Sequence, residues 1–324
     1  MKYRTLGRTG WQVSEIGFGM WGMGSWSNSD DAESLDALHR AVALGYNFFD
    51  TAWAYGEGRS EQLLGKLIHT CPEKALYTAS KIPPKNFTWP ARPEHRLEDT
   101  YPYEHMIDFT ERTLKNLGQD HIDLMQLHVW DDTWADDERW QRAIEDLKRH
   151  GKIRAFGISV NRWEPTNVIR ALRTGHIDSV QVIYNIFDQN PEDELFPLCA
   201  ELNIGVITRV PFDEGSLTGN LTKATTWPKD DWRNSYFTPD NLSTTVDRVE
   251  SLRQTVPSST TMSELALRFI LTNSTVSTVI PGMRKISHVE SNAAASDGDV
   301  LSKDMVDQLR PYRWVRIPTR AWSP

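Results

Sequence analysis

Four polar residues, Asp50, Tyr55, Lys81 and His128, lie at or just beyond the ends of short apolar segments that are typical of buried strands. A tyrosine hydroxyl has a pKa of about 10 in water and is therefore a weak acid at neutral pH. A lysine ammonium beside the hydroxyl stabilises the phenolate and lowers its pKa, and a carboxylate can hold the ammonium in place. A histidine can orient the oxygen that exchanges the proton. These residue types indicate proton transfer to a carbonyl oxygen or from an alcohol.

Each of the four residues also fits a purely structural role. An aspartate can cap a strand end, a tyrosine can pack, a lysine can be a solvated surface charge and a histidine can lie in the core. Their joint position favours chemistry, because the carboxyl ends of the strands in a β/α barrel all open onto one face.

The elements that must position these residues alternate regularly along the chain. Nearly continuous apolar runs, separated by amphipathic helical segments, predict parallel strands that are covered on the outside. We therefore expect an α/β fold, a (β/α)8 TIM barrel formed as one domain over residues 1–324, with a doubly wound sheet as the alternative. The expected strands are 16–19, 47–50, 76–81, 122–128, 153–159, 179–183, 205–208 and 277–280, after a hairpin at 3–13. The expected helices are about 29–44, 60–68, 103–117, 137–149, 164–173, 191–202 and 263–271.

Two long connections, 82–105 and 210–244, each follow the carboxyl end of an expected strand. Connections of this length without regular structure are uncommon in compact domains, and many of them are functional. We expect both to be long βα loops that influence specificity.

Composition restricts the partners of the protein. The 324 residues carry a net charge of −8, and the basic residues are scattered, which argues against nucleic acid or an anionic membrane as a partner. No apolar run approaches the length of a membrane span, and the first residues do not resemble a signal peptide. Two cysteines, Cys71 and Cys199, cannot form a disulfide framework. We expect a cytoplasmic monomer or homo-oligomer that acts on a small molecule.

A glycine motif, Gly17-Phe18-Gly19-Met20-Trp21-Gly22, has the spacing of the Rossmann dinucleotide-binding fingerprint. That fingerprint requires a helix that opens at the glycines and an acidic residue about 20 positions later. Residues 37–49 contain no acidic residue, and a loop follows the glycines. A glycine-rich turn at the mouth of the first barrel strand is the better interpretation.

Several segments in order resemble the aldo-keto reductase superfamily. The segment GYNFFDTAWAYGEGRSEQLLGKLI is similar to the family signature, TASKI to its lysine strand and HIDLMQLHVW to its histidine strand. The resemblance extends from GFGMW to STVIPGMRK, which is nearly the whole chain. It implies hydride transfer between a nicotinamide and a carbonyl or alcohol, such as an aldehyde, ketone or sugar. It also implies the catalytic tetrad Asp50, Tyr55, Lys81 and His128, with Tyr55 as general acid/base.

The resemblance further implies a cofactor that lies extended across the barrel mouth. Ser159, Asn161 and Gln181 would contact the carboxamide, although a turn or a core hydrogen bond explains each of them as well. Many relatives place an aromatic ring under the nicotinamide after the seventh strand. Here Arg209 stands at about that position, so Arg209 stacks there, or Phe212 does, or the stacking is lost. The remaining cofactor-binding residues would be Gly19, Met20, Trp21, Pro211, Gly282, Met283, Arg284, His288 and Asn292.

The segment at 280–292 favours NADP(H) over NAD(H). Arg284, Lys285 and His288 suit a 2′-phosphate, and no carboxylate precedes Glu290 to select a bare ribose hydroxyl. The alternative is that Arg284 and Lys285 are the solvated start of a helix.

Three tryptophans, Trp21, Trp53 and Trp130, fall at expected strand mouths and suggest a pocket for a sugar, terpenoid or aromatic carbonyl compound. Ordinary packing explains any one of them equally well. We expect no metal site. The aspartates in the run DDTWADDERW lack EF-hand spacing, so a loop that caps the next helix is the preferred interpretation.

Two other functions compete with the reductase. One is an NADP(H)-binding regulatory subunit with little turnover, which resembles ion-channel β-subunits of this family. The intact tetrad argues against it. The other is a metal-dependent barrel hydrolase, which needs clustered ligands at strand ends, where only His128 and Asp50 qualify.

Overall fold

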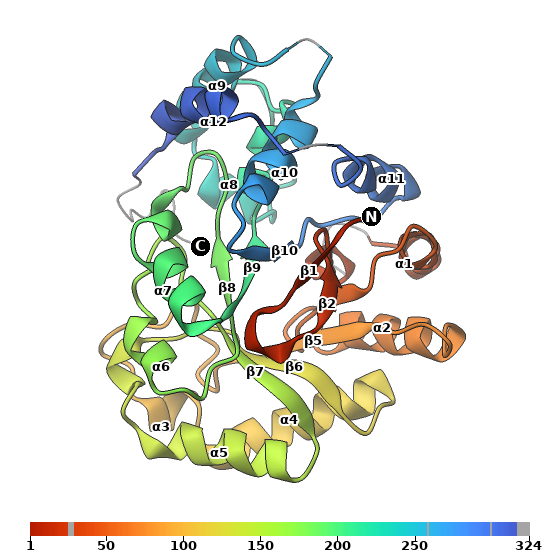
Figure 1. The fold of residues 1–324 in the computed structure, drawn as a ribbon, viewed down its shortest axis with the longest axis vertical. Coiled ribbons are helices and arrows are strands. Elements are labelled where there is room, and N and C mark those ends of the chain that lie inside the picture. Colours follow the sequence, from red (N-terminus) through yellow and green to blue (C-terminus); the bar gives the residue numbers. More distant parts are fainter. Residues whose placement is uncertain (25–28, 258, 299, 316–324) are drawn as a thin grey trace.

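Eight parallel strands form the centre of the protein, and helices surround them (Figure 1). The computed structural model describes residues 1–24, 29–257, 259–298 and 300–315. Strands that follow one another in the chain are neighbours in the sheet, in the order β10-β9-β8-β7-β6-β5-β4-β3. The strands are β3 (Phe18–Gly19), β4 (Phe48–Asp50), β5 (Tyr77–Ile82), β6 (Ile122–Leu127), β7 (Ile153–Ser159), β8 (Ser179–Ile183), β9 (Gly205–Arg209) and β10 (Val276–Val279).

Backbone bonds between the first and last strands close this sheet into a barrel. The amide of Gly17 donates to the carbonyl of Val279 at 2.8 Å, and that of Gly19 to Pro281 at 3.0 Å. A Cβ atom at Gly19 would lie 2.6 Å from the carbonyl oxygen of Ile280, so this approach requires glycine. The predicted (β/α)8 barrel is confirmed, and the doubly wound alternative is wrong because its sheet would keep two open edges.

The helices pack around the barrel, and several begin at side-chain caps. Asp30, Asp137 and Thr261 each accept a hydrogen bond from a backbone amide of the first turn that follows. None of the described helices is long and apolar enough to cross a membrane. The helices are α1 (Asp31–Ala43), α2 (Arg59–Thr70), α3 (Leu97–Thr100), α4 (Tyr103–Leu117), α5 (Glu138–Arg149), α6 (Ile169–Arg173), α7 (Leu195–Leu202), α8 (Arg233–Tyr236), α9 (Pro239–Arg253), α10 (Met262–Thr272), α11 (Ile286–Ala294) and α12 (Lys303–Leu309).

A two-stranded hairpin covers the amino-terminal end of the barrel (Figure 1). Its strands are β1 (Tyr3–Thr5) and β2 (Gln12–Ser14). Leu6 and Val13 pack into one apolar cluster with Phe48, Leu124 and Ile207 of the barrel strands. Because the hairpin closes this end, the opposite end, where the strands terminate, remains for a functional site.

The long connection at 210–244 is more structured than predicted. It contains α8 and the start of α9, whose buried residues Leu242, Val246 and Val249 give it an apolar face. The sequence pattern missed α9 because its first turns, PDNLSTT, are poor in strong helix formers. Helices α6 and α7 are also shorter than predicted. Pro165 and Pro191 lie in the turns before them, where each predicted helix would have begun.

A buried carboxyl group connects α2 to the barrel. Glu61 on α2 has no exposed surface, and it accepts hydrogen bonds from Ser80 of β5 at 2.5 Å and from Thr113 of α4 at 2.8 Å. The amide of Asn116 donates to its other oxygen at 2.7 Å. Glu61 therefore fixes α2 against the strand that also carries Lys81.

We predict that Glu61→Ala lowers the free energy of unfolding by about 3 kcal/mol or more, because three donors, two of them buried, lose their acceptor. Chemical denaturation followed by circular dichroism measures this change. The control is Gln62→Ala, at an exposed neighbouring position of α2. A loss for Glu61→Ala no larger than that of the control would contradict the prediction.

Candidate active site at the barrel mouth

Three neighbouring strands and one turn bring the four predicted residues together. Asp50 is the last residue of β4, Lys81 is the next-to-last of β5, and His128 directly follows β6. Tyr55 lies in the turn between β4 and α2, and its ring is partly exposed. The parallel register aligns these strand ends on one face of the barrel.

The ammonium group of Lys81 forms the centre of the cluster. Lys81 Nζ lies 2.5 Å from Asp50 Oδ1, and it donates to the carbonyl oxygen of Thr51 at 2.8 Å. It also lies 3.3 Å from the hydroxyl of Tyr55. Both charged side chains are almost completely buried. The arrangement couples the hydroxyl directly to a buried ion pair.

Two glutamines complete the hydrogen bonding of Asp50. Gln181 Nε2 donates to Asp50 Oδ2 at 2.8 Å, and Gln126 Nε2 donates to the same oxygen at 3.2 Å. We did not single out Gln126 from the sequence. It stands two positions before His128 on an apolar strand, so the two side chains share one face of the strand, and this spacing is the signal that could have identified it.

The pKa values of Tyr55 and Lys81 differ in part from the expectation drawn from the sequence. Burial raises the pKa of the Tyr55 hydroxyl above its usual value, and Lys81 opposes this change without cancelling it. The expected effect of Lys81 is therefore present, but the expected net lowering is wrong. Burial alone would lower the pKa of Lys81, yet the Asp50 carboxylate outweighs burial and raises it. At neutral pH Tyr55 is protonated and Lys81 is charged.

His128 is a neutral side chain beside Tyr55. The two rings lie 5.8 Å apart at 75°. Burial, followed by the positive charges of Lys81 and Arg209, lowers the pKa of His128 well below its usual value. Its Nδ1 atom is buried, and the described part of the chain offers it no hydrogen-bond partner. An oxygen of a bound ligand would suit this imidazole.

The residues predicted to hold the carboxamide are Ser159 at the end of β7, Asn161 just after it and Gln181 in the middle of β8. Ser159 and Gln181 are buried side chains of these strands. Gln181 uses its amide nitrogen on Asp50, which leaves its oxygen as the atom suited to accept from a carboxamide. Asn161 donates to the carbonyl oxygen of Ala91 and to Glu164, both at 3.1 Å. These bonds use both N–H groups of Asn161, so its Oδ1 atom, which accepts from the amide of Trp130 at 3.5 Å, is the atom suited to accept from a carboxamide.

Arg209 ends β9, and its guanidinium reaches back to β7. Arg209 Nη2 donates to the carbonyl oxygen of Val160 at 2.8 Å, next to Ser159 and Asn161. Pro211 is buried, whereas Phe212 is partly buried against the main core. Arg209 is therefore the side chain from this segment that borders the predicted carboxamide site.

The predicted adenosine end lies around β3 and α11. Met283 and Asn292 are buried, whereas Gly282 and His288 are exposed. Burial, and then the charges of Lys285 and Arg284, lower the pKa of His288, so three cationic or ionisable groups gather at the start of this helix. A phosphate group fits this donor set, because a helix amino terminus and basic side chains both favour anions.

Arg284 connects this helix start to the loop after β3. Its Cδ atom would lie 3.1 Å from a Cβ atom at Gly22. In the same segment Met20 is buried and its amide donates to the carbonyl of Asp50 at 2.9 Å. The helix begins only at Asp31, which agrees with our rejection of the Rossmann fingerprint.

The three candidate pocket tryptophans have different surroundings. Trp21 is 41% exposed, and Trp53 is partly buried beside Phe87. Trp130 has no exposed surface. It packs edge-to-face against Trp134 and Trp140, which makes it a core residue rather than part of a pocket.

Sequence reasoning missed two aromatic residues of the loop after β5. Trp89 lies edge-to-face with the His128 ring at 5.8 Å, and Phe87 is 56% exposed and lies beside Trp89. The composition of the 82–105 connection indicated a functional loop but not which of its residues would reach the mouth.

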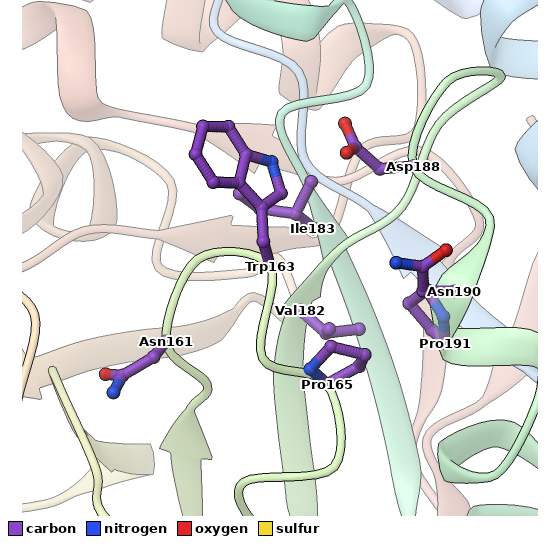
Figure 2. Close-up of a pocket in the computed structure, with 8 residues that line it drawn as sticks. All are labelled: Asn161, Trp163, Pro165, Val182, Ile183, Asp188, Asn190 and Pro191. Carbon is purple, nitrogen blue, oxygen red and sulfur yellow. The ribbon is translucent and has the colours of Figure 1, made fainter. Parts of the chain in front are cut away.

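A small cavity lies behind the ends of β7 and β8 (Figure 2). Figure 2 shows Asn161 and Trp163 on one loop with side chains that point apart. The cavity volume is about 10 Å³, which is room for about one water molecule. The cavity is too small to be a cofactor or substrate site.

Known proteins are similar in sequence to this chain over most of its length. Aldo-keto reductase YhdN of Bacillus subtilis is 28% identical over 317 residues, which cover 95% of this chain and 92% of the relative. The NADH-specific methylglyoxal reductase of Escherichia coli is 27% identical, with coverage of 95% and 99%. A probable voltage-gated potassium channel subunit beta of Oryza sativa is 26% identical, with 95% of each chain covered.

A solved structure of an aldo-keto reductase is also similar to this chain. The holo form of aldo-keto reductase AKR11C1 from Bacillus halodurans superposes with a TM-score of 0.77 at 27% identity, and the match covers all of both chains. The sequence model of the aldo/keto reductase family matches residues 15–312. The chain is a member of the aldo/keto reductase family.

Proposed function

We propose that this protein transfers a hydride between NADP(H) and a carbonyl or alcohol substrate, with Tyr55 as general acid/base. The observation that carries the proposal is the position of Lys81 Nζ, between Asp50 Oδ1 at 2.5 Å and the Tyr55 hydroxyl at 3.3 Å. A tyrosine held by a buried ammonium can give a proton to a developing alkoxide and stand as a stabilised phenolate afterwards.

The four tetrad side chains would each have a separate role in proton transfer. A bound nicotinamide would supply or accept the hydride. Tyr55, protonated at neutral pH, donates its proton to the substrate oxygen in reduction, and its phenolate form accepts the alcohol proton in oxidation. The neutral imidazole of His128 donates a hydrogen bond that orients the same oxygen. Lys81 stabilises the phenolate, and Asp50 keeps Lys81 charged.

The preference for NADP(H) rests on the cations at the start of α11. Arg284, Lys285 and His288 gather there, and basic groups favour a 2′-phosphate. The Escherichia coli relative is named as NADH-specific, which argues for NAD(H) instead, so the cofactor preference needs its own measurement.

The aromatic side chains near the tetrad support a substrate with an apolar or ring-shaped body. Trp21 is well exposed, and Trp53 and Trp89 border the side of the mouth that carries His128. A sugar, terpenoid or aromatic carbonyl compound suits such surfaces. Both cysteines are free, which fits a reducing compartment such as the cytoplasm.

A regulatory role is the second candidate, because the rice relative is named a probable channel β-subunit. The two functions differ in turnover, since a regulatory subunit would bind the nucleotide with little reduction of any carbonyl. The complete Lys81–Tyr55 arrangement favours the enzyme.

We predict that Tyr55→Phe lowers kcat for carbonyl reduction by about 100-fold to 10,000-fold, because it removes the transferred proton and leaves the ring in place. Stopped-flow or steady-state oxidation of NADPH measures the loss, and fluorescence titration should give an unchanged Kd for NADPH. Tyr3→Phe, at the opposite end of the barrel, is the matched control. Near-normal turnover of Tyr55→Phe would refute the mechanism.

The pH dependence of reduction follows from the raised pKa of Tyr55 and the lowered pKa of His128. Reduction needs protonated Tyr55, whose pKa is raised, so kcat/KM should be level between about pH 6 and pH 9 and fall only at higher pH. Oxidation should rise with pH over the alkaline range. His128 stays neutral, so no break should appear at about pH 6.5. A bell-shaped profile centred near neutrality would contradict these assignments.

We predict that Arg284→Ala weakens NADPH binding by about 10-fold to 100-fold and changes NADH binding by less than about 2-fold. The reason is that the guanidinium would contact only the additional phosphate of NADPH in the proposed binding mode. Tryptophan fluorescence titration with both nucleotides measures the two Kd values, with Lys303→Ala as a control for the loss of an exposed charge. An equal loss for both nucleotides would show that Arg284 does not select the phosphate.

A further inference from the structure

Tyr55 lies in the turn between β4 and α2, whereas Asp50 and Lys81 belong to strands. Hydrogen bonds to the neighbouring strands fix the residues of a strand, and turn residues are generally more mobile. The hydroxyl of Tyr55 nevertheless lies 3.3 Å from Lys81 Nζ. Contacts within and around the turn must therefore keep the hydroxyl within reach of the ammonium.

The backbone directly after Tyr55 has a strained conformation. Gly56, Glu57 and Gly58 have φ values of 69°, 52° and 92°. All three values lie in the left-handed region, which glycine adopts readily and glutamate only at a cost. A Cβ atom at Gly56 would lie 2.6 Å from the carbonyl oxygen of Gly24, so the turn packs closely against the loop after β3. A conformation of this kind persists only where surrounding contacts impose it.

Two buried hydroxyl groups join the ends of this turn. Thr51 Oγ1 donates to Ser60 Oγ at 2.7 Å, and Ser60 Oγ donates to the carbonyl oxygen of Met20 at 3.2 Å. Neither Thr51 nor Ser60 has exposed surface. The amide of Ser60 also donates to the carbonyl oxygen of Tyr55 at 3.2 Å. Because Tyr55 stands between the two residues in the chain, the hydroxyl pair closes the loop that carries the phenol.

Thr51 also contacts the lysine. Its carbonyl oxygen accepts from Lys81 Nζ at 2.8 Å, and its amide donates to the carbonyl oxygen of Ala79 on β5 at 2.8 Å. Thr51 therefore holds the ammonium with its backbone and the tyrosine turn with its side chain. One residue thus affects the positions of both groups in the contact between Lys81 and Tyr55.

We propose that the hydroxyl pair of Thr51 and Ser60 positions Tyr55 for proton transfer by fixing the distance between the phenol and Lys81. This inference rests on the proposed function and adds two positioning residues to it. A displacement of about 1 Å can lower the rate of an enzyme about 100-fold. A weaker contact with the ammonium would also reduce the stabilisation of the phenolate. Both residues would act through Tyr55.

The first test removes one hydroxyl at a time and follows carbonyl reduction. Thr51→Val and Ser60→Ala should each lower kcat about 10-fold to 100-fold. The Kd for NADPH should change by less than about 2-fold. Thr51→Ser retains the hydroxyl and should keep kcat close to that of the wild type. The double variant should be no slower than the slower single variant, because the two side chains act through one hydrogen bond.

The pH profile gives a readout that a purely structural role would not change. Lys81 lowers the pKa of Tyr55, against the larger effect of burial. A hydroxyl that moves away from Lys81 loses this stabilisation, so the pKa of Tyr55 rises. The alkaline increase in the rate of oxidation should therefore move to higher pH in Thr51→Val and in Ser60→Ala. If Thr51→Val does not fold, Ser60→Ala alone decides the test.

The matched control is Thr110→Val on α4. Thr110 is a buried threonine whose hydroxyl donates to the carbonyl oxygen of Met106 in the same helix. Its loss should lower Tm without changing kcat or the pH profile.

A further readout does not depend on turnover. Protein labelled with meta-fluorotyrosine gives a fluorine NMR signal for Tyr55, which is assigned by its absence in Tyr55→Phe. This signal should shift or broaden in Thr51→Val and in Ser60→Ala, and it should be unchanged in Thr110→Val. A changed signal together with a wild type that reduces no carbonyl would support the hold on Tyr55 and refute the proposed function.

Three outcomes would overturn the positioning pair. The first is near-normal kcat and an unchanged pH profile in both single variants. The second is a loss of kcat in Thr51→Ser as large as in Thr51→Val, which would assign the effect to the methyl group. The third is a weaker Kd for NADPH with an unchanged pH profile, which would mean that Ser60 acts through Met20 on the nucleotide.

Discussion

The buried ion pair between Lys81 and Asp50 is the constraint on which the candidate active site depends. Removing two charges from water costs several kcal/mol per ion, so the pair is stable only if its remaining hydrogen-bonding groups are satisfied. An ammonium has three N–H groups. In this protein they meet three acceptors: Asp50 Oδ1, the carbonyl oxygen of Thr51 and the hydroxyl of Tyr55. The need to satisfy the lysine therefore fixes the position of the tyrosine.

The closed barrel makes this arrangement possible, because the participating residues come from strands far apart in the chain. Gln126 on β6 and Gln181 on β8 both donate to Asp50 on β4, so these three strands must present side chains to a common centre. Glu61 adds a hydrogen bond between α2 and β5, at the residue next to Lys81. The proposed proton chemistry at the mouth thus depends on hydrogen bonds that also stabilise the fold.

Much of the fold was predictable because parallel barrel strands carry a strong local pattern. The predicted bounds of β7 and β8 agree with the structure at both ends. The tetrad was predictable because its residues stand at strand ends within family motifs. Long-range contacts were not predictable. A tryptophan after a strand can face the mouth or the core, and Trp130 packs inward because Trp134 and Trp140 follow it on elements that fold over the strand end.

The most direct test of the central claim is a double-mutant cycle on carbonyl reduction with Lys81→Met, Tyr55→Phe and the combined variant. If Lys81 acts through the tyrosine hydroxyl, the double variant should be no slower than Tyr55→Phe alone, because residues that act as a unit show strongly non-additive losses. Rate losses that multiply in the double variant would mean that the two side chains act independently. That result would contradict the account.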